Sequence, residues 1–120
     1  MRRIAVTGGR DFNSIPIVTW AFDTIGLCGD DTLVHGGCRG ADDLCARVAY
    51  FNYGAETEAY YADWKRYGRA AGPKRNREML ESGIDLLIAF PGGKGTFNCV
   101  MTAKSLGIPI LEVDGTEEGA

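Results

Sequence analysis

The sequence lacks an apolar run long enough to cross a lipid bilayer. Its longest strongly apolar run covers residues 86–90, whereas a membrane-spanning helix needs about 20 residues. A secretory signal is missing as well, because only four residues separate the basic Arg3 from Gly8 and no apolar core fits between them. We therefore expect a soluble, cytoplasmic protein with no membrane partner.

The sequence also has little that could hold a metal ion. Its four cysteines, at positions 28, 38, 45 and 99, form no CxxC pair. The single histidine, His35, could be combined with Cys38 and Cys45, but Cys45 belongs to the apolar face of a predicted helix. The pattern favours reduced, structural thiols, and we predict neither a metal site nor a cofactor.

Excess positive charge is absent too. The net charge is −3, which argues against a protein that wraps a long nucleic-acid duplex. Cations nevertheless gather within residues 63–78, as Lys65, Arg66, Arg69, Lys74, Arg75 and Arg77. A local basic patch on an acidic protein suits a small anion better than a polymer, so nucleic acid is not an expected partner.

Apolar segments typical of strands alternate with helical ones along the chain. Strands are predicted over residues 3–7, 32–36, 56–62, 84–90 and 108–113. Helices are predicted over residues 15–26 after a Ser14 cap, along an apolar stripe from Ala41 to Ala49, over 72–82 from Gly72-Pro73, and over 96–106. The alternation predicts an α/β fold, a single Rossmann-like three-layer domain with a mainly parallel five-stranded sheet and helices on both faces. We place this domain at residues 1–114 and expect a flexible acidic tail over residues 115–120.

Three glycine-rich stretches follow predicted strands: VTGGRDF (6–12), VHGGCRGAD (34–42) and AFPGGKGTFNC (89–99). Glycine permits positive φ and lets backbone N–H groups approach a phosphate without a Cβ in the way. In a parallel sheet all three stretches lie at the carboxyl edge, where ligands bind and helix N-termini point unpaired N–H groups. They predict a phosphate site built from Gly8, Gly9, Arg10, Gly36, Gly37, Arg39, Gly92, Gly93, Lys94, Gly95 and Thr96. We also expect the Thr96 hydroxyl to cap the helix that follows.

Cations stand at the starts of the predicted helices, where the macrodipole disfavours each of them by about 0.3–1 kcal/mol. These cations are Arg10, Arg39, Lys74, Arg75 and Lys94. An anion between them would account for the set, whereas any one of them could simply point into solvent. The guanidinium of Arg75 is predicted to bind a phosphate through two parallel hydrogen bonds.

Common nucleotide-binding and deaminase motifs are absent. A Walker loop requires GxxxxGK[ST], whereas GGKGT has Gly95 after its lysine. No GxGxxG follows the first strand, which argues against a standard NAD site, and the HxE and PCxxC motifs of zinc deaminases are missing.

Three long motifs nevertheless resemble those of a known family. VTGGRDF, HGGCRGADDLCA and ADWKRYGRAAGPKRNREML…IDLLIAFPGGKGT are similar, over roughly residues 3–113, to the small YspA (cpYpsA-related) branch of the SLOG superfamily. The resemblance implies a Rossmann-like fold that binds a nucleotide or nucleotide-derived ligand, often as a homodimer or higher homo-oligomer. SLOG domains are associated with immune signalling, which implies a role as a sensor or a sponge, in phage defence or against it.

PGGKGTFNC also resembles the PGGxGTxxE motif of the LOG phosphoribohydrolases, which use that glutamate together with an upstream arginine. In this sequence Cys99 stands at the position of the glutamate, and Arg75 matches the arginine, allowing one extra residue before Pro91. A thiol does not replace a carboxylate in stabilising an oxocarbenium-like centre. The resemblance therefore implies binding rather than hydrolysis; if the chain is an enzyme, Arg75 and Cys99 are the candidate catalytic residues.

Three functions stay open at this point. The favoured one is capture of an ADP-ribose-like or cyclic-nucleotide molecule, in which Asp42 or Asp43 accepts a ribose hydroxyl. The second is N-glycosidic hydrolysis of nucleoside monophosphates by Arg75 with Asp42, Asp43 or Glu78. The third is single-strand DNA binding, since GGCRGADDLCA is similar to the GxARGID turn of the DNA-processing protein A family.

The sequence also allows predictions for two groups of side chains near the predicted site. Asn98 and Cys99 are expected to face the ligand cleft. For the aromatic side chains, a core or dimer-interface role is favoured over stacking on a base; these are Tyr60, Tyr61, Trp64 and Tyr67.

Overall fold

Five parallel strands form one sheet in the computed structural model, which describes residues 1–115. The sheet order is β3-β2-β1-β4-β5, and every neighbouring pair runs parallel. The strands are β1 (Arg3–Thr7), β2 (Thr32–His35), β3 (Glu56–Ala59), β4 (Leu86–Ala89) and β5 (Ile110–Glu112). The chain winds outward from β1 to β3 and then returns to β4 on the other side of β1. The topological switch point therefore lies between β1 and β4, where open α/β sheets bind ligands.

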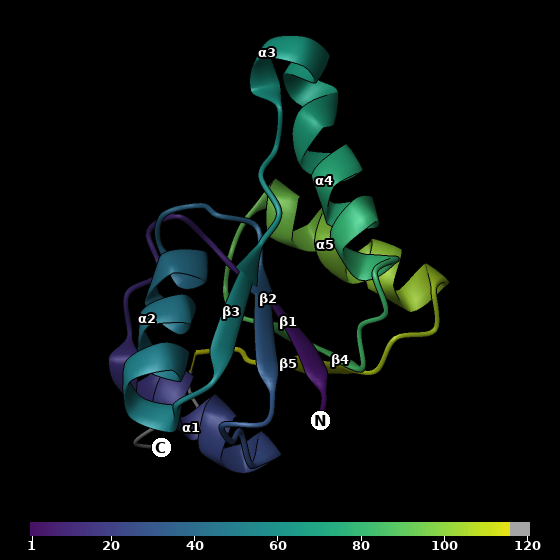
Figure 1. The fold of residues 1–120 in the computed structure, drawn as a ribbon. Coiled ribbons are helices and arrows are strands. Elements are labelled where there is room, and N and C mark those ends of the chain that lie inside the picture. Colours follow the sequence, from purple (N-terminus) through teal and green to yellow (C-terminus); the bar gives the residue numbers. More distant parts are fainter. Residues whose placement is uncertain (116–120) are drawn as a thin grey trace.

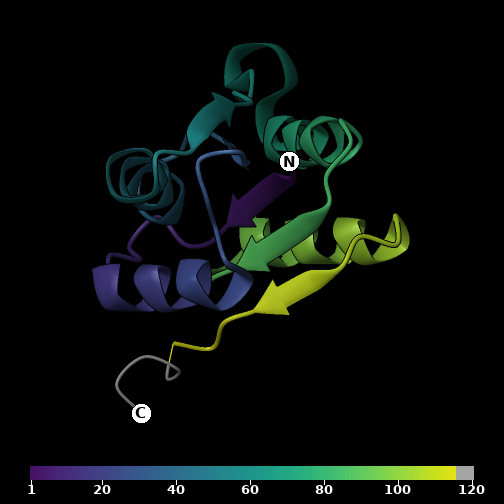
Figure 2. The ribbon, with the colours of Figure 1, turned by 60° about the horizontal axis from the view of Figure 1, so that its bottom comes forward.

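Helices cover both faces of the sheet, which confirms the predicted three-layer α/β architecture (Figures 1 and 2). They are α1 (Ile15–Ile25), α2 (Ala41–Tyr53), α3 (Trp64–Tyr67), the 3-10 turn η1 (Gly68–Ala70), α4 (Ala71–Leu80) and α5 (Lys94–Ser105). In Figure 2, α1 and α2 lie on one side of the sheet, and α4 and α5 lie on the other. Each face has its own apolar cluster, one around Phe22 and Phe90 and the other around Met79 and Leu87.

The elements follow the sequence pattern, with differences at their ends. Ser14 caps α1 as predicted, since its side chain accepts a hydrogen bond from the Ile17 N–H at 3.3 Å. The last helix starts two residues earlier than predicted, at Lys94, and its cap is Gly93. The prediction that Thr96 caps this helix was therefore wrong, because Thr96 already lies within the first helical turn.

Residues 64–70 form an arm that the sequence pattern did not predict. Asp63 starts α3 by accepting a hydrogen bond from the Arg66 N–H at 3.1 Å, and η1 then leads directly into α4. None of the residues in α3 or η1 is buried, so no amphipathic stripe marked them. Figure 1 shows α3 above the carboxyl edge of the sheet. Pro73 is the third residue of α4, so the prediction that Gly72-Pro73 opens this helix was wrong.

Two further expectations concern the ends of the chain and membranes. The predicted tail over residues 115–120 lies, apart from Gly115, outside the described residues. No helix within residues 1–115 combines the length and apolar character needed to cross a membrane.

Asp31 joins the start of β1 to the turn before β2. Its carboxylate is 3% exposed and accepts a hydrogen bond from Arg2 Nη2 at 2.9 Å. The backbone N–H groups of Arg2 and Cys28 donate to the same carboxylate at 3.1 Å. The Arg2 hydrogen bond is the main reason that the pKa of Asp31 lies below its ordinary value.

This lowered pKa predicts a specific pH dependence. The stabilisation is fully present above the unfolded-state pKa of about 3.9 and is lost as pH falls through the lower folded-state pKa. We expect Asp31→Asn to reduce the free energy of unfolding at neutral pH by about 1–3 kcal/mol. The variant should also lose less stability on acidification than the parent, as measured by urea titrations between about pH 3 and pH 7. Equal losses in both proteins would contradict this role for Asp31.

Candidate functional site

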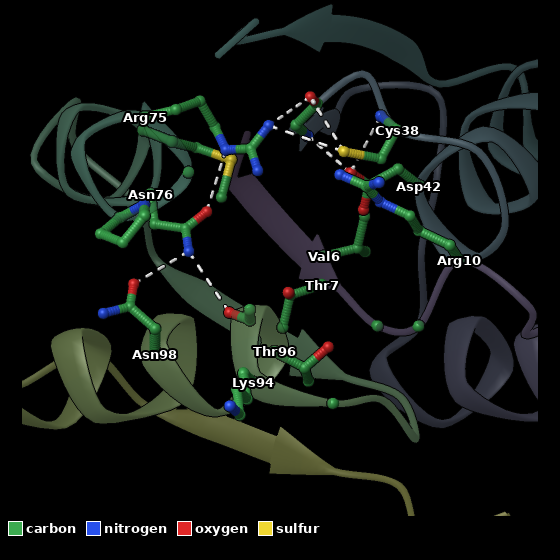
Figure 3. A pocket seen from close by; sticks show the side chains of 18 of the residues that line it. Val6, Thr7, Arg10, Cys38, Asp42, Arg75, Asn76, Lys94, Thr96 and Asn98 are labelled. Atoms are coloured by element: carbon green, nitrogen blue, oxygen red, sulfur yellow. Dashed lines mark hydrogen bonds between the residues drawn. The ribbon is translucent and has the colours of Figure 1, made fainter. Parts of the chain in front are cut away.

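A cavity of about 520 Å³ opens at the switch point of the sheet (Figure 3). Its walls come from the end of β1 and the loop after it, the loop after β2, the arm with α4, and the first turn of α5. This volume lies within the range of small-molecule sites, about 300–1,000 Å³. The cavity is thus the place in the fold where the three glycine-rich stretches could share a ligand.

Most of the residues predicted for the site line this cavity. Those that do are Gly8, Gly9, Arg10, Gly36, Asp42, Arg75, Gly93, Lys94, Gly95 and Thr96. Gly37, Arg39 and Gly92 do not. The Arg39 side chain is 75% exposed and lies 3.7 Å from Asp11, and Gly37 lies against the ring of Tyr61. Gly92 packs its backbone against the Gly9 loop, where the Gly9 N–H donates to Pro91 O at 2.8 Å.

The entrance of α5 leaves backbone donors free. Among residues 1–115, none accepts a hydrogen bond from the backbone N–H of Lys94, Gly95 or Thr96; the first helical bond runs from Phe97 N–H to Gly93 O, at 3.0 Å. These three N–H groups lie at the positive end of the helix macrodipole and on the cavity wall. The α5 entrance therefore has the geometry of an anion site.

The loop after β2 differs, because its amides are already used. Asp42 Oδ2 accepts hydrogen bonds from the N–H groups of Gly36 at 3.1 Å and Cys38 at 3.3 Å. The Gly37 N–H donates to His35 Nδ1 at 3.0 Å. The start of α2 is satisfied in the same way, since the Ala41 N–H donates to Gly9 O at 3.1 Å. This loop consequently offers a ligand its side chains rather than its backbone.

Asp42 is 7% exposed and is the sole carboxylate among the described residues that line the cavity. Its Oδ1 atom makes no hydrogen bond to any described residue, whereas Oδ2 accepts two. Burial raises the pKa of Asp42 above its ordinary value, and burial likewise lowers the pKa of the neighbouring His35. Asp42 thus presents one free acceptor to whatever enters the cavity.

Arg75 is held in place by carbonyl groups of two loops and by its neighbour Asn76 in α4 (Figure 3). Its Nη1 donates to Gly36 O at 2.5 Å and to Tyr60 O at 3.5 Å, and its Nε donates to Asn76 Oδ1 at 2.9 Å. Asn76 in turn donates to Asn98 Oδ1 at 3.0 Å, which connects Arg75 to α5. Arg75 Nη2 makes no hydrogen bond within residues 1–115, so a fixed guanidinium keeps one free edge.

The charges of the cavity are unbalanced. Seven of the 13 lysine and arginine side chains lie within 4.0 Å of a carboxylate, which leaves six without an ion pair among the described residues. Four of these six line the cavity: Arg10, Arg69, Arg75 and Lys94. Unpaired cations around one concave site favour binding of an anion.

Trp64 is the aromatic side chain on the cavity wall. It is 48% exposed, and the Arg10 guanidinium lies 5.9 Å from the centre of its ring. Glycine at position 72 leaves room for this ring, because a Cβ there would lie 3.1 Å from Trp64 Cη2. Trp64 is half exposed and does not belong to the core, so of the expected core or dimer-interface role only the interface stays a prediction for it. Tyr60 does pack against the core.

Cys99 does not face the cavity, contrary to expectation. It is fully buried, and burial raises the pKa of its thiol to about 11. Its neighbour Asn98 does line the cavity. At the position where the LOG motif has a glutamate, this chain therefore places a buried, neutral thiol.

The four cysteines are expected to react with iodoacetamide at different rates. Cys28 is exposed, Cys38 is half-buried on the cavity wall, and Cys45 and Cys99 are buried. Burial also raises the pKa of Cys45, and a protonated thiol is a poor nucleophile. Peptide mapping should show Cys28 labelled first and Cys38 next, with Cys45 and Cys99 labelled only after unfolding. Labelling of Cys99 as fast as Cys28 would contradict the burial described above.

Asn76 and Arg69 belong to the site but were not predicted. Asn76 is 5% exposed, and nothing in a single sequence marks a buried asparagine within a basic helix. Arg69 was noted in the basic segment, yet it lies on η1, which had no pattern of its own. Within residues 1–115, no cluster of histidine, cysteine, aspartate and glutamate side chains could hold a metal ion.

Comparison with known proteins identifies the family. A family model described as "YspA, cpYpsA-related SLOG family" matches residues 2–67, more than half of the chain. The chain is also 37% identical over 123 aligned residues to the Gene 61 protein of Mycobacterium phage D29, across 92% of this chain and 95% of the relative. Membership of this family points to a nucleotide-related ligand, and the name of the relative states no activity. The chain belongs to the YspA, cpYpsA-related SLOG family, as its motifs predicted.

Proposed function

We propose that this protein binds a nucleotide-derived small molecule in the switch-point cavity and does not cleave it. The observation that carries the proposal is a set of four cations around one cavity that have no carboxylate partner within residues 1–115. They lie next to three α5 amides that have no acceptor in the same part of the chain. A phosphate would neutralise those cations and accept the hydrogen bonds of those amides.

Each remaining part of a nucleotide has a candidate partner. A ribose hydroxyl would donate to the free Oδ1 of Asp42, which is already fixed through Oδ2. The base would stack on Trp64, whose ring is half exposed at the cavity; stacking of this kind contributes about 1–3 kcal/mol in nucleic-acid readers. The free Nη2 of Arg75 would bind a phosphate oxygen. The two parallel hydrogen bonds predicted from the sequence are not expected, because Nε and Nη1 already donate to Asn76, Gly36 and Tyr60.

Binding without hydrolysis is supported by Cys99. A buried thiol with a pKa of about 11 neither accepts a proton at neutral pH nor reaches a substrate in the cavity. Hydrolysis remains the second candidate, because the cavity does contain one carboxylate, Asp42, within the same wall as Arg75. In that case Asp42 would assume the role that the missing glutamate has in the LOG enzymes.

A pure binder acts either as a sensor or as a sponge that sequesters a signal. The similarity to a phage protein favours the sponge, because lowering the concentration of a host signal requires capture alone. The homo-oligomer implied by the family stays a prediction, which light scattering would test.

The proposal is tested by a thermal-shift screen of AMP, ADP, ADP-ribose, NAD and cyclic dinucleotides. A ligand present at 100 times its Kd should add about 2.7 kcal/mol to the free energy of unfolding. Each stabilising ligand is then recovered after denaturation and analysed by chromatography. Intact recovery supports a binder, release of free base establishes the hydrolase, and absence of stabilisation by every compound would refute the proposal.

A further inference from the structure

The cations of the cavity lie on two sides of it. Figure 3 shows Lys94 and Thr96 on the α5 side and Arg10 and Arg75 on the opposite side, with Val6 and Thr7 of β1 between them. Arg10 comes from the loop after β1 and Arg75 from α4. Arg69, from η1 just before α4, lines the same cavity.

The α5 side has enough donors for one phosphoryl group without help from the arginines. It offers the free N–H groups of Lys94, Gly95 and Thr96, together with the Lys94 ammonium and the Thr96 hydroxyl. A terminal phosphoryl group has three oxygens, so this turn satisfies it. The guanidinium groups on the other side then need a second anion.

The net positive charge of the cavity also exceeds the negative charge of a single phosphate group. Four cations and one carboxylate line the cavity, which leaves an excess of +3 even when Asp42 is ionised. A phosphate monoester carries about −1.5 to −2 at neutral pH. A nucleoside diphosphate carries roughly one further negative charge, which matches the excess.

We propose that the ligand contains two linked phosphoryl groups, one on the α5 turn and one held by Arg10, Arg69 and Arg75, so that nucleoside diphosphates and their esters are preferred over monophosphates. This inference rests on the proposed function and names the chemical class of its ligand. Asp42, beside the arginines, then orients the sugar rather than repelling the phosphates, since its Oδ1 is free for a hydroxyl donor.

The test is isothermal titration of the full chain with the matched pairs AMP and ADP, GMP and GDP, CMP and CDP, and UMP and UDP. For each base that binds, the diphosphate should bind at least about 10-fold more tightly than the monophosphate. Arg10→Ala and Arg69→Ala should reduce this ratio towards one, while Lys94→Ala should weaken both members of a pair. Lys65→Ala is the matched control, because Lys65 is an exposed cation outside the cavity, and it should leave the ratio unchanged.

The outcomes separate this inference from the function on which it rests. Equal or tighter binding of the monophosphate in every pair that binds would overturn the inference and leave nucleotide binding intact. A diphosphate preference that is insensitive to Arg10→Ala and Arg69→Ala, or that falls equally in Lys65→Ala, would overturn the two-sided arrangement. Absence of binding by all eight compounds would overturn this inference, and the proposed function would fall only if the thermal-shift screen were negative as well.

Discussion

Replacing Arg75 with alanine is expected to weaken nucleotide binding by about 30-fold or more, which corresponds to about 2 kcal/mol. The guanidinium is fixed by Gly36 O, Tyr60 O and Asn76 Oδ1, so its free Nη2 edge is preorganised for an anion. Alanine removes that edge and the charge together. Calorimetric titration with the nucleotide that gives the largest thermal shift measures the loss, and circular dichroism checks that the variant is folded.

Two companion variants make this result specific. Arg75→Lys keeps the charge but cannot both make the hydrogen bonds that fix the guanidinium and offer a free donor to the ligand, so it should recover only part of the affinity. Arg39→Ala removes a cation that is 75% exposed and turned towards Asp11, and it should bind like the parent. If Arg75→Ala and Arg39→Ala bound equally well, the assignment of the site to this cavity would be wrong.

Substituting Gly40 with alanine is expected to produce the largest loss of stability, about 3 kcal/mol or more. Gly40 has φ 80° and ψ −126°, a conformation that residues with a Cβ rarely adopt. A Cβ there would also overlap the backbone carbonyl groups of Gly9 and Arg10. The substitution would therefore separate the loop after β1 from the start of α2 and open the cavity wall.

Gly54→Ala is the matched control for this prediction. Gly54 also has positive φ, 70°, but no atom lies within 4 Å of the Cβ that alanine would add. Its loss should be limited to backbone strain, about 1 kcal/mol. Thermal or urea unfolding of both variants measures the difference. Equal losses of stability would show that the close contact between Gly40 and the Gly9 loop does not contribute to the cost of the Gly40 substitution.

The fold could be predicted from the sequence because its strands and main helices carry strong local signals. The apolar run in β4 and the apolar stripe of α2 identify a buried strand and an amphipathic helix. The arm over residues 64–70 carries no such signal, since all of its side chains are exposed. Its helix depends on one capping aspartate, Asp63, whose effect is local.

The site was predicted in outline, but the partners of each group were not. The glycine-rich stretches marked the correct edge of the sheet, as parallel topology requires. Which amides stay free depends on tertiary hydrogen bonds: those after β2 are used by Asp42 and His35, whereas those of α5 have no partner in the described chain. The direction of Arg39 and the burial of Cys99 likewise follow from packing that sequence spacing does not show.

The central claim is that an anion binds the free amides at the start of α5, opposite Arg75. The most direct measurement is a ¹H–¹⁵N correlation spectrum of the labelled protein during titration with ADP. We predict the largest shifts at the backbone amides of Lys94, Gly95 and Thr96 and at Arg75 Nε, with small shifts at Gly36 and Cys38, whose amides already donate to Asp42. Saturable shifts confined to other parts of the chain, or no shifts at ADP concentrations in the millimolar range, would contradict the account.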